Sequence, residues 1–139
     1  MGASLRGSNA AAANFSRSDW TDAIASNANF YGALFADAIA RRAKFSHSNL
    51  ERVNARGACL VGAILDDARL VCAEVSAADL TDASIRGADV RQASFAESKF
   101  ANCDMADCDA EGASFAGALM GNARRNRARR AEFYNVSDA

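Results

Sequence analysis

The chain has 139 residues, half of them apolar, with 16 basic and 17 acidic side chains, four Cys, one His and no Pro. This length fits one domain, and the apolar content together with 24% charged residues argues against disorder. A net charge of -1 gives no reason to expect an anionic membrane or nucleic acid as a direct partner. No signal peptide, transmembrane segment or disulfide framework is recognisable, so a cytoplasmic protein is expected.

An apolar residue recurs at every fifth position from Leu5 to Met120, and all 24 of these positions, called centres below, are apolar. Two residues before each centre only small side chains occur, namely 17 Ala, four Ser, two Cys and Val53. None of the charged residues between positions 3 and 122 falls on either position. The chain therefore has a five-residue period in which two positions are reserved for the interior.

A period of five fits neither a helix, with its 3.6-residue spacing, nor a long alternating strand. The centre and the small residue lie two apart, so in an extended segment both point to one face, while the outward residue between them points to solvent. The next two residues must turn the chain. The second of these is Gly, Asp or Asn at 15 positions, and such residues tolerate the positive φ of tight turns. Each unit is predicted to be a short strand followed by a corner.

The order of Ala, a polar residue, Leu or Phe, and two variable residues resembles the motif of the pentapeptide-repeat family. Residues 78–82, 28–32 and 113–117 match it closely. The resemblance covers residues 3–122 and implies an all-β fold, a right-handed quadrilateral β-helix with four units per coil. Twenty residues per coil would give about six coils, and the strand spacing of about 4.8 Å would make the rod about 29 Å long.

The pattern fails after Ala123, where an arginine-rich run with good helix formers begins. We expect residues 3–122 to form the pentapeptide-repeat β-helix and residues 123–139 to form a short basic C-terminal cap, either a helix or the start of a further repeat at Phe133. No cap precedes the first coil. A solenoid normally shields its terminal layers, so we expect end-to-end self-association or a longer native sequence.

No arrangement of residues typical of an active site is recognisable. His47 is the single His and lies on a turn position, which leaves no catalytic triad and no zinc set. Cys103 and Cys108 occupy small-residue positions, where a thiol packs as a compact apolar group. We therefore expect no catalytic residue, no metal site and no cofactor, and predict a chain that is not an enzyme.

Charge is unevenly spread, with a net +3 over residues 1–59, -7 over 60–118 and +3 over 119–139. Some proteins of the resembled family are similar to duplex DNA in size, shape and charge, and protect or inhibit DNA gyrase by occupying its DNA site. The resemblance thus implies an alternative function, a DNA mimic acting on gyrase or topoisomerase, of the quinolone-resistance type. Basic residues are interleaved with these acids, however, which favours the ordinary role of surface charge in keeping a protein in solution. The candidate acidic surface comprises Asp66, Asp67, Asp79, Asp82 and Asp89.

Apolar residues also occupy several outward positions, which the resembled family usually gives to polar side chains. In a four-sided coil Ile39 and Cys59 stack on one side, while Ile24 and Ile64 share another side across Lys44. An exposed apolar cluster with a polar rim marks an interface. The preferred function is therefore a rigid binding or scaffold module with a protein as its partner; a module of a secreted effector or secretion-associated protein is a third hypothesis. The candidate interaction surface comprises Ile24, Tyr31, Leu34, Ile39, Cys59, Val61 and Ile64.

Overall fold

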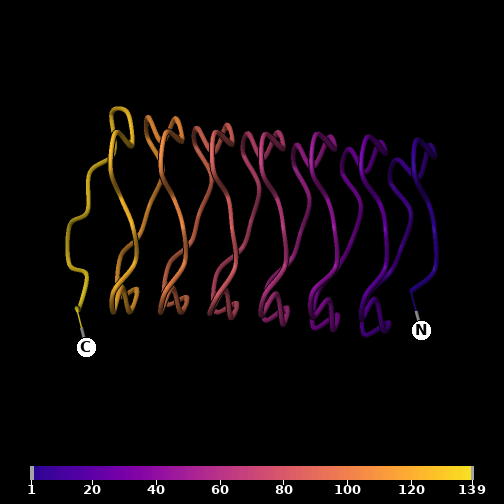
Figure 1. Cartoon of the computed structure of the whole chain (residues 1–139), viewed down its shortest axis with the longest axis horizontal. Coiled ribbons are helices and arrows are strands. Elements are labelled where there is room, and N and C mark those ends of the chain that lie inside the picture. The colour runs from indigo at the N-terminus through magenta and orange to yellow at the C-terminus, as the bar shows by residue number, and fades with distance from the viewer. Residues whose placement is uncertain (1, 139) are drawn as a thin grey trace.

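The computed structural model describes residues 2–138 and is a rod of stacked coils, with the two termini at opposite ends (Figure 1). Residues 2–138 contain no helix, and their β-structure consists of single parallel bridges. These bridges join outward residues that lie 20 apart, from Ser4 with Ile24 to Asp109 with Arg129. The four-sided, 20-residue coil predicted from the sequence is confirmed. Coils 1 to 6 span residues 3–22, 23–42, 43–62, 63–82, 83–102 and 103–122.

The bridges place the outward residues in four columns, one for each side of the rod. On the first side these residues are Ser4, Ile24, Lys44, Ile64, Ser84, Asp104 and Arg124. On the second side they are Asn9, Asn29, Asn49, Arg69, Asp89, Asp109 and Arg129. On the third side they are Asn14, Leu34, Asn54, Glu74, Ser94 and Ser114. On the fourth side they are Asp19, Ile39, Cys59, Asp79, Lys99, Leu119 and Ser137.

The corners are tight turns, and between residues 5 and 123 all but one are closed by a backbone hydrogen bond. At the remaining corner the Ala78 amide donates to Ser98 Oγ, which in turn donates to the Val75 carbonyl. In the first corner the amide of Ser8 donates to the carbonyl of Leu5 at 3.0 Å, and the amide of Gly7 donates to Ser26 in the next coil at 3.1 Å. Every second corner residue from 7 to 122 has a positive φ, whether it is Gly or not, as in Gln92 with a φ of 60°. A positive φ at this turn position is the mark of a type II turn. The turns and the bridges therefore repeat with the five-residue period.

The type of apolar residue in the core changes along the rod. Aromatic centres pack together in the first coils, where the rings of Phe35 and Trp20 lie 5.3 Å apart, and again near the C-terminus, where Phe95 stacks on Phe115 at 5.3 Å. Aliphatic centres fill the middle and leave an apolar cavity of about 30 Å³. The small-residue column is buried from Ala23 to Ala118, because only short side chains fit where the four walls of a coil converge.

The two ends of the rod differ. In coil 1 the centres Leu5, Ala10 and Phe15 are only partly buried. At the other end the guanidinium of Arg125 lies 5.0 Å from the ring centroid of Phe133 and 3.4 Å from the carboxylate of Asp138. Arg125 thus lies over the ring of Phe133 at the C-terminal end, whose last apolar residues are also only partly buried. The end-to-end self-association expected for the first coil remains a prediction.

The helix that the composition of the C-terminal segment allows does not form within residues 123–138. Arg124 and Arg129 instead bridge to Asp104 and Asp109 and begin a seventh coil. Pairing satisfies the backbone groups at the edge of coil 6, whereas a helix this short is marginal on its own. The last bridge joins Leu119 to Ser137, 18 residues on instead of 20, so the final turn of the chain is two residues shorter.

Candidate interaction surfaces

Five of the seven residues of the predicted interaction surface lie on or beside the edge between the fourth and first sides. Ile39 is bridged to Cys59 on the fourth side, and Lys44 is bridged to both Ile24 and Ile64 on the first side. Val61 lies at the corner between them. The side chain of Ile39 is 45% exposed, while the other four are partly buried. These residues, called the edge patch below, are Ile24, Ile39, Cys59, Val61 and Ile64.

The remaining two residues lie elsewhere on the rod. Leu34 is 39% exposed on the third side, where it is bridged to Asn14 and Asn54. Tyr31 is 42% exposed at the corner between the second and third sides, diagonally opposite the edge patch. The structure therefore does not bring Tyr31 and Leu34 together with the edge patch in one continuous surface.

Leu119 is a further exposed apolar residue, in the same column as Ile39 but four coils on, and is 40% exposed. It lies outside the predicted interaction surface, which was concentrated between positions 24 and 64. The 20-residue spacing alone assigns Leu119 to the fourth side, so its place in the column of Ile39 could have been predicted from the sequence. The fourth side is thus apolar at three of its seven outward positions, more than any other side.

Two cations stand inside the edge patch. Lys44 separates the two isoleucines of the first side, and Arg41 occupies the corner one coil before Val61. Neither forms an ion pair within the described residues 2–138. Their neighbour Arg42 is paired with Asp22, Nε to Oδ1 at 2.7 Å. The edge patch therefore combines exposed aliphatic groups with positive charge that the chain itself leaves uncompensated.

The five residues of the predicted acidic surface do not form a single stripe. Asp66 and Asp67 lie at the corner between the first and second sides, Asp89 lies on the second side and Asp79 on the fourth. Asp82 lies at the corner between the fourth and first sides. The acidic surface therefore wraps around the rod in coils 4 and 5.

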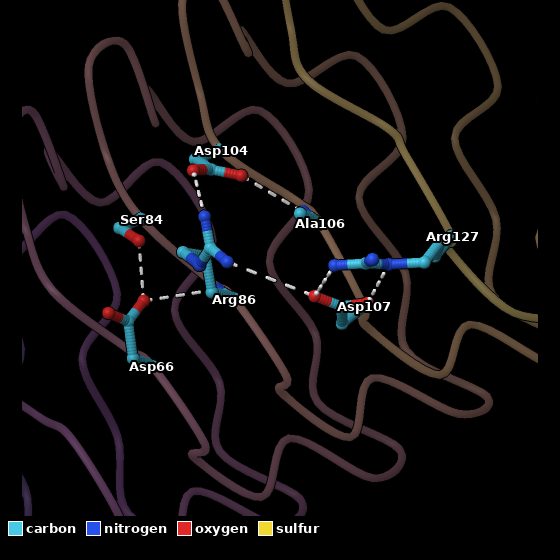
Figure 2. A network of polar contacts seen from close by, with 7 residues as sticks. All are labelled: Asp66, Ser84, Arg86, Asp104, Ala106, Asp107 and Arg127. Carbon is cyan, nitrogen blue, oxygen red and sulfur yellow. Dashed lines mark hydrogen bonds and ion pairs between the residues drawn. The ribbon is translucent and has the colours of Figure 1, made fainter.

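Arginine pairs with carboxylates next to this surface, as Figure 2 shows for coils 4 to 7, and with one of its five residues, Asp89. Arg86 reaches Asp104 at 3.1 Å and Asp107 at 3.9 Å, and Arg127 holds Asp107 from the other side at 2.6 Å. The backbone amide of Arg86 donates to Asp66 at 3.0 Å. On the second side Asp89 is paired in the same way with Arg91 at 2.7 Å. Duplex DNA presents unpaired phosphates, so these pairs reduce the likeness of this surface to DNA.

The same arginines lower the pKa of their carboxylate partners. A hydrogen bond from Arg127 lowers the pKa of Asp107, one from Arg130 lowers that of Asp109, and one from Arg91 lowers that of Asp89. Asp107 lies at the surface, where salt screens its pair and makes its contribution to stability small, whereas the side chain of Asp109 is only 13% exposed beside Arg130. The lowered pKa values therefore affect mainly how the stability of the folded chain depends on pH.

We expect the melting temperature to be constant from neutral pH down to about pH 5 and to fall below about pH 4. The unfolded chain takes up protons near the ordinary carboxyl pKa of 3.8, whereas the folded chain resists them until lower pH. The stabilisation is present above the unfolded pKa and is lost as pH falls through the folded one. Asp107→Asn with Asp109→Asn should reduce this acid loss in thermal melts, and Asp37→Asn, outside any ion pair among residues 2–138, should not. Equal acid loss in both variants would contradict the assignment.

The cysteines and the histidine show no arrangement suited to metal binding. Among residues 2–138 no group of three His, Cys, Asp or Glu side chains could hold a metal ion. Burial raises the pKa of the Cys103 thiol well above its usual range and that of Cys108 to about 11. Both thiols are therefore protonated packing groups at neutral pH. His47 is exposed, with Nε2 lying 3.8 Å from a carboxylate oxygen of Asp67.

The fold and the repeat define the class of protein. The family model described as pentapeptide repeats matches residues 1–39, 28–67, 58–95 and 83–124, with 8 copies of the repeat. The chain therefore belongs to the pentapeptide-repeat family, and its rod is the right-handed quadrilateral β-helix that the sequence resemblance implied. Comparison with curated protein sequences finds no match. No helix among the described residues could cross a membrane.

Solved structures share this fold at low sequence identity. One trypsin-treated form of QnrB1, a plasmid-mediated fluoroquinolone resistance protein, aligns with a TM-score of 0.55 at 18% identity over 86% of this chain. The chain spans 63% of the length of that structure. A second trypsin-treated form aligns with a TM-score of 0.51 at 14% identity, over 99% of this chain and 79% of the other. The pentapeptide-repeat protein Rfr23 from the cyanobacterium Cyanothece 51142 aligns at 0.45 and 20% identity, over 87% and 90% of the two chains.

Proposed function

We propose that the chain is a rigid, non-enzymatic module that binds another protein through the edge patch. The observation that supports this proposal is that aliphatic side chains are exposed at outward positions, where a polar side chain is sufficient for folding. Outward positions hold Asn, Asp, Ser or charged residues along most of the rod, so Ile39 and Ile64 are not required for folding. Apolar groups that leave water on association are the usual source of binding energy at the centre of an interface.

The rod is suited to present such a surface without rearrangement. Coils 1 to 5 are each bridged on all four sides to the next, and all but one of the turns in coils 1 to 6 are closed by backbone hydrogen bonds. A surface that is already ordered loses little conformational entropy when a partner binds, which favours affinity. The two free cations at Arg41 and Lys44 would favour a partner with carboxylates beside its apolar groups.

The test is capture of proteins from an extract of the native host by the immobilised chain. We expect Ile39→Asp with Ile64→Asp to reduce capture of the partner at least about tenfold, because two apolar contacts are replaced by charges. The matched control places two aspartates at outward positions of the third side that are not neighbours, Asn14→Asp with Ser114→Asp, and should bind normally. Both variants should melt close to the wild type. Undiminished capture by the isoleucine variant would contradict the proposal.

A DNA mimic acting on gyrase or topoisomerase is the second candidate, supported by the net charge of -7 over residues 60–118. Its surface would be the acidic residues Asp66, Asp67, Asp79, Asp82 and Asp89. Their distribution over several sides and the arginine pairs of the neighbouring carboxylates weigh against it. The protein-binding module is therefore the function that we prefer.

A further inference from the structure

The fourth side differs from the rest of the rod in how its charges are compensated. Ion pairs gather on the first and second sides and at the C-terminal end, where Arg86, Arg91 and Arg130 each hold a carboxylate. On the fourth side and its two edges, within coils 1 to 5 of the described chain, a single ion pair forms, between Arg42 and Asp22. The other charges of this side are left for solvent or for a partner.

Six of the eleven charged side chains on this side and its edges in coils 1 to 5 are ordered symmetrically about Cys59. The fourth-side ladder runs Asp19, Ile39, Cys59, Asp79, Lys99, so an acid lies two coils before Cys59 and a base lies two coils after it. The edge columns repeat this relation. On one edge, Arg17 lies two coils before Gly57 and Glu97 lies two coils after it. On the other edge, Arg42 lies one coil before Gly62 and Asp82 lies one coil after it. All six of these charged side chains are exposed.

We propose that two copies of the chain pair side by side and antiparallel through their fourth sides, about a two-fold axis that passes by Cys59. In such a pair each column of one copy faces the same column of the second copy, running in the opposite direction. A residue that lies a given number of coils before Cys59 therefore meets the residue that lies the same number of coils after Cys59 in the second copy. Opposite charges then meet at every position named above. The facing pairs are Arg17 with Glu97 and Asp19 with Lys99, each formed twice. Arg42, which Asp22 of its own chain already holds at 2.7 Å, faces Asp82 as well.

The centre of the proposed interface is apolar and small. Cys59 and Val61 would meet their own copies at the axis, with Gly57 and Gly62 leaving a flat surface on either side. Arg56 lies in the same row at the rim, where solvent screens its repulsion from the second copy. Ile39 would face Asp79, the one poorly matched contact on the ladder. This proposal rests on the proposed function, because it names a second copy as a partner of the apolar fourth side.

The size of the surface sets the expected strength. Coils 1 to 5 overlap in this register, over about 24 Å along the rod and at most about 16 Å across five extended residues. That is about 800 Å² for both copies together, below the range of stable specific interfaces and in the range of weak, transient contacts. We therefore expect a weak dimer with a Kd of about 100 μM, weakened further by salt.

Sedimentation equilibrium from about 10 μM to about 500 μM tests the pairing. Asp19→Lys should weaken the dimer about tenfold, because each substitution turns two attractive contacts into repulsive ones. Adding Lys99→Asp should restore it. The two residues are four bridges apart, about 19 Å within one chain, so rescue cannot come from a contact inside the monomer. Glu74→Lys, the same charge change on the third side, should leave the dimer unaffected.

Two further variants distinguish this pairing from binding of a different protein. Ile39→Lys should tighten the dimer by placing a cation opposite Asp79, whereas Ile39→Asp should weaken it; an apolar interface with another protein would lose affinity with both. A short bismaleimide should join Cys59 of two copies in a Cys72→Ser background. A monomer at every concentration, or failure of Lys99→Asp to rescue, would overturn the pairing, and capture of another protein through Ile39 and Ile64 would still be measured independently.

Discussion

Phe35→Asp is expected to unfold the protein. Phe35 is a centre of coil 2, 5% exposed, and its ring lies 5.2 Å from Phe15, 5.5 Å from Phe30 and 6.1 Å from Phe45. The substitution removes these contacts and places a carboxylate in an apolar layer with no partner, at a cost of about 5 kcal/mol or more. Thermal unfolding followed by circular dichroism measures the effect.

The matched control lies two residues along the chain. Asp37 is an exposed corner residue with a φ of 57°, and Asp37→Ala should cost only about 1 kcal/mol because no core contact is lost. Similar shifts in melting temperature for the two variants would contradict the division into inward and outward positions.

Deletion of single residues and of whole coils should have opposite outcomes. Removal of residues 63–82 takes out one complete coil and joins Gly62 to Ala83, so every later residue keeps its side and its column. This shortened rod should fold and melt cooperatively, at a lower temperature because it buries less apolar surface. Removal of Asp66 alone should abolish folding of the coils that follow it.

The reason is register. After a one-residue deletion the outward residues move to inward positions, so that charged groups such as Arg69 and Asp89 would have to be buried. Circular dichroism and limited proteolysis distinguish the two variants. A stable single-residue deletion, or an unfolded coil deletion, would be incompatible with the 20-residue coil.

Much of the fold could be predicted because one rule governs 24 successive units. The apolar centres and the small residues two before them are buried as expected from Trp20 to Met120, and the corner residues have the positive φ that their composition indicated. The C-terminal segment could not be predicted. Its arginines favour a helix locally, but pairing with coil 6 decides the structure, and the two-residue shortening before Ser137 has no signature in a five-residue pattern.

The surface was predictable in part. The spacing correctly stacked Ile39 on Cys59 and placed Ile24 and Ile64 on either side of Lys44. The compensation of the acidic residues was missed, because a charge count along the chain ignores contacts between coils. The 20-residue period could have indicated two of these pairs, since Arg42 and Arg127 lie one coil after Asp22 and Asp107. The reach of Arg86 to Asp104, 18 residues on, depends on side-chain conformation.

The most direct test of the central claim, a protein-binding module and not a DNA mimic, is a gyrase supercoiling assay with the purified chain. We predict no inhibition and no protection from quinolones at micromolar concentrations, because the carboxylates of coils 4 to 6 are dispersed and partly paired with arginine. Micromolar inhibition or protection would contradict the account, provided that it weakens steeply with salt. It should then be lost when Asp66, Asp67, Asp79, Asp82 and Asp89 are replaced by Asn, and should persist in the Ile39→Asp, Ile64→Asp variant.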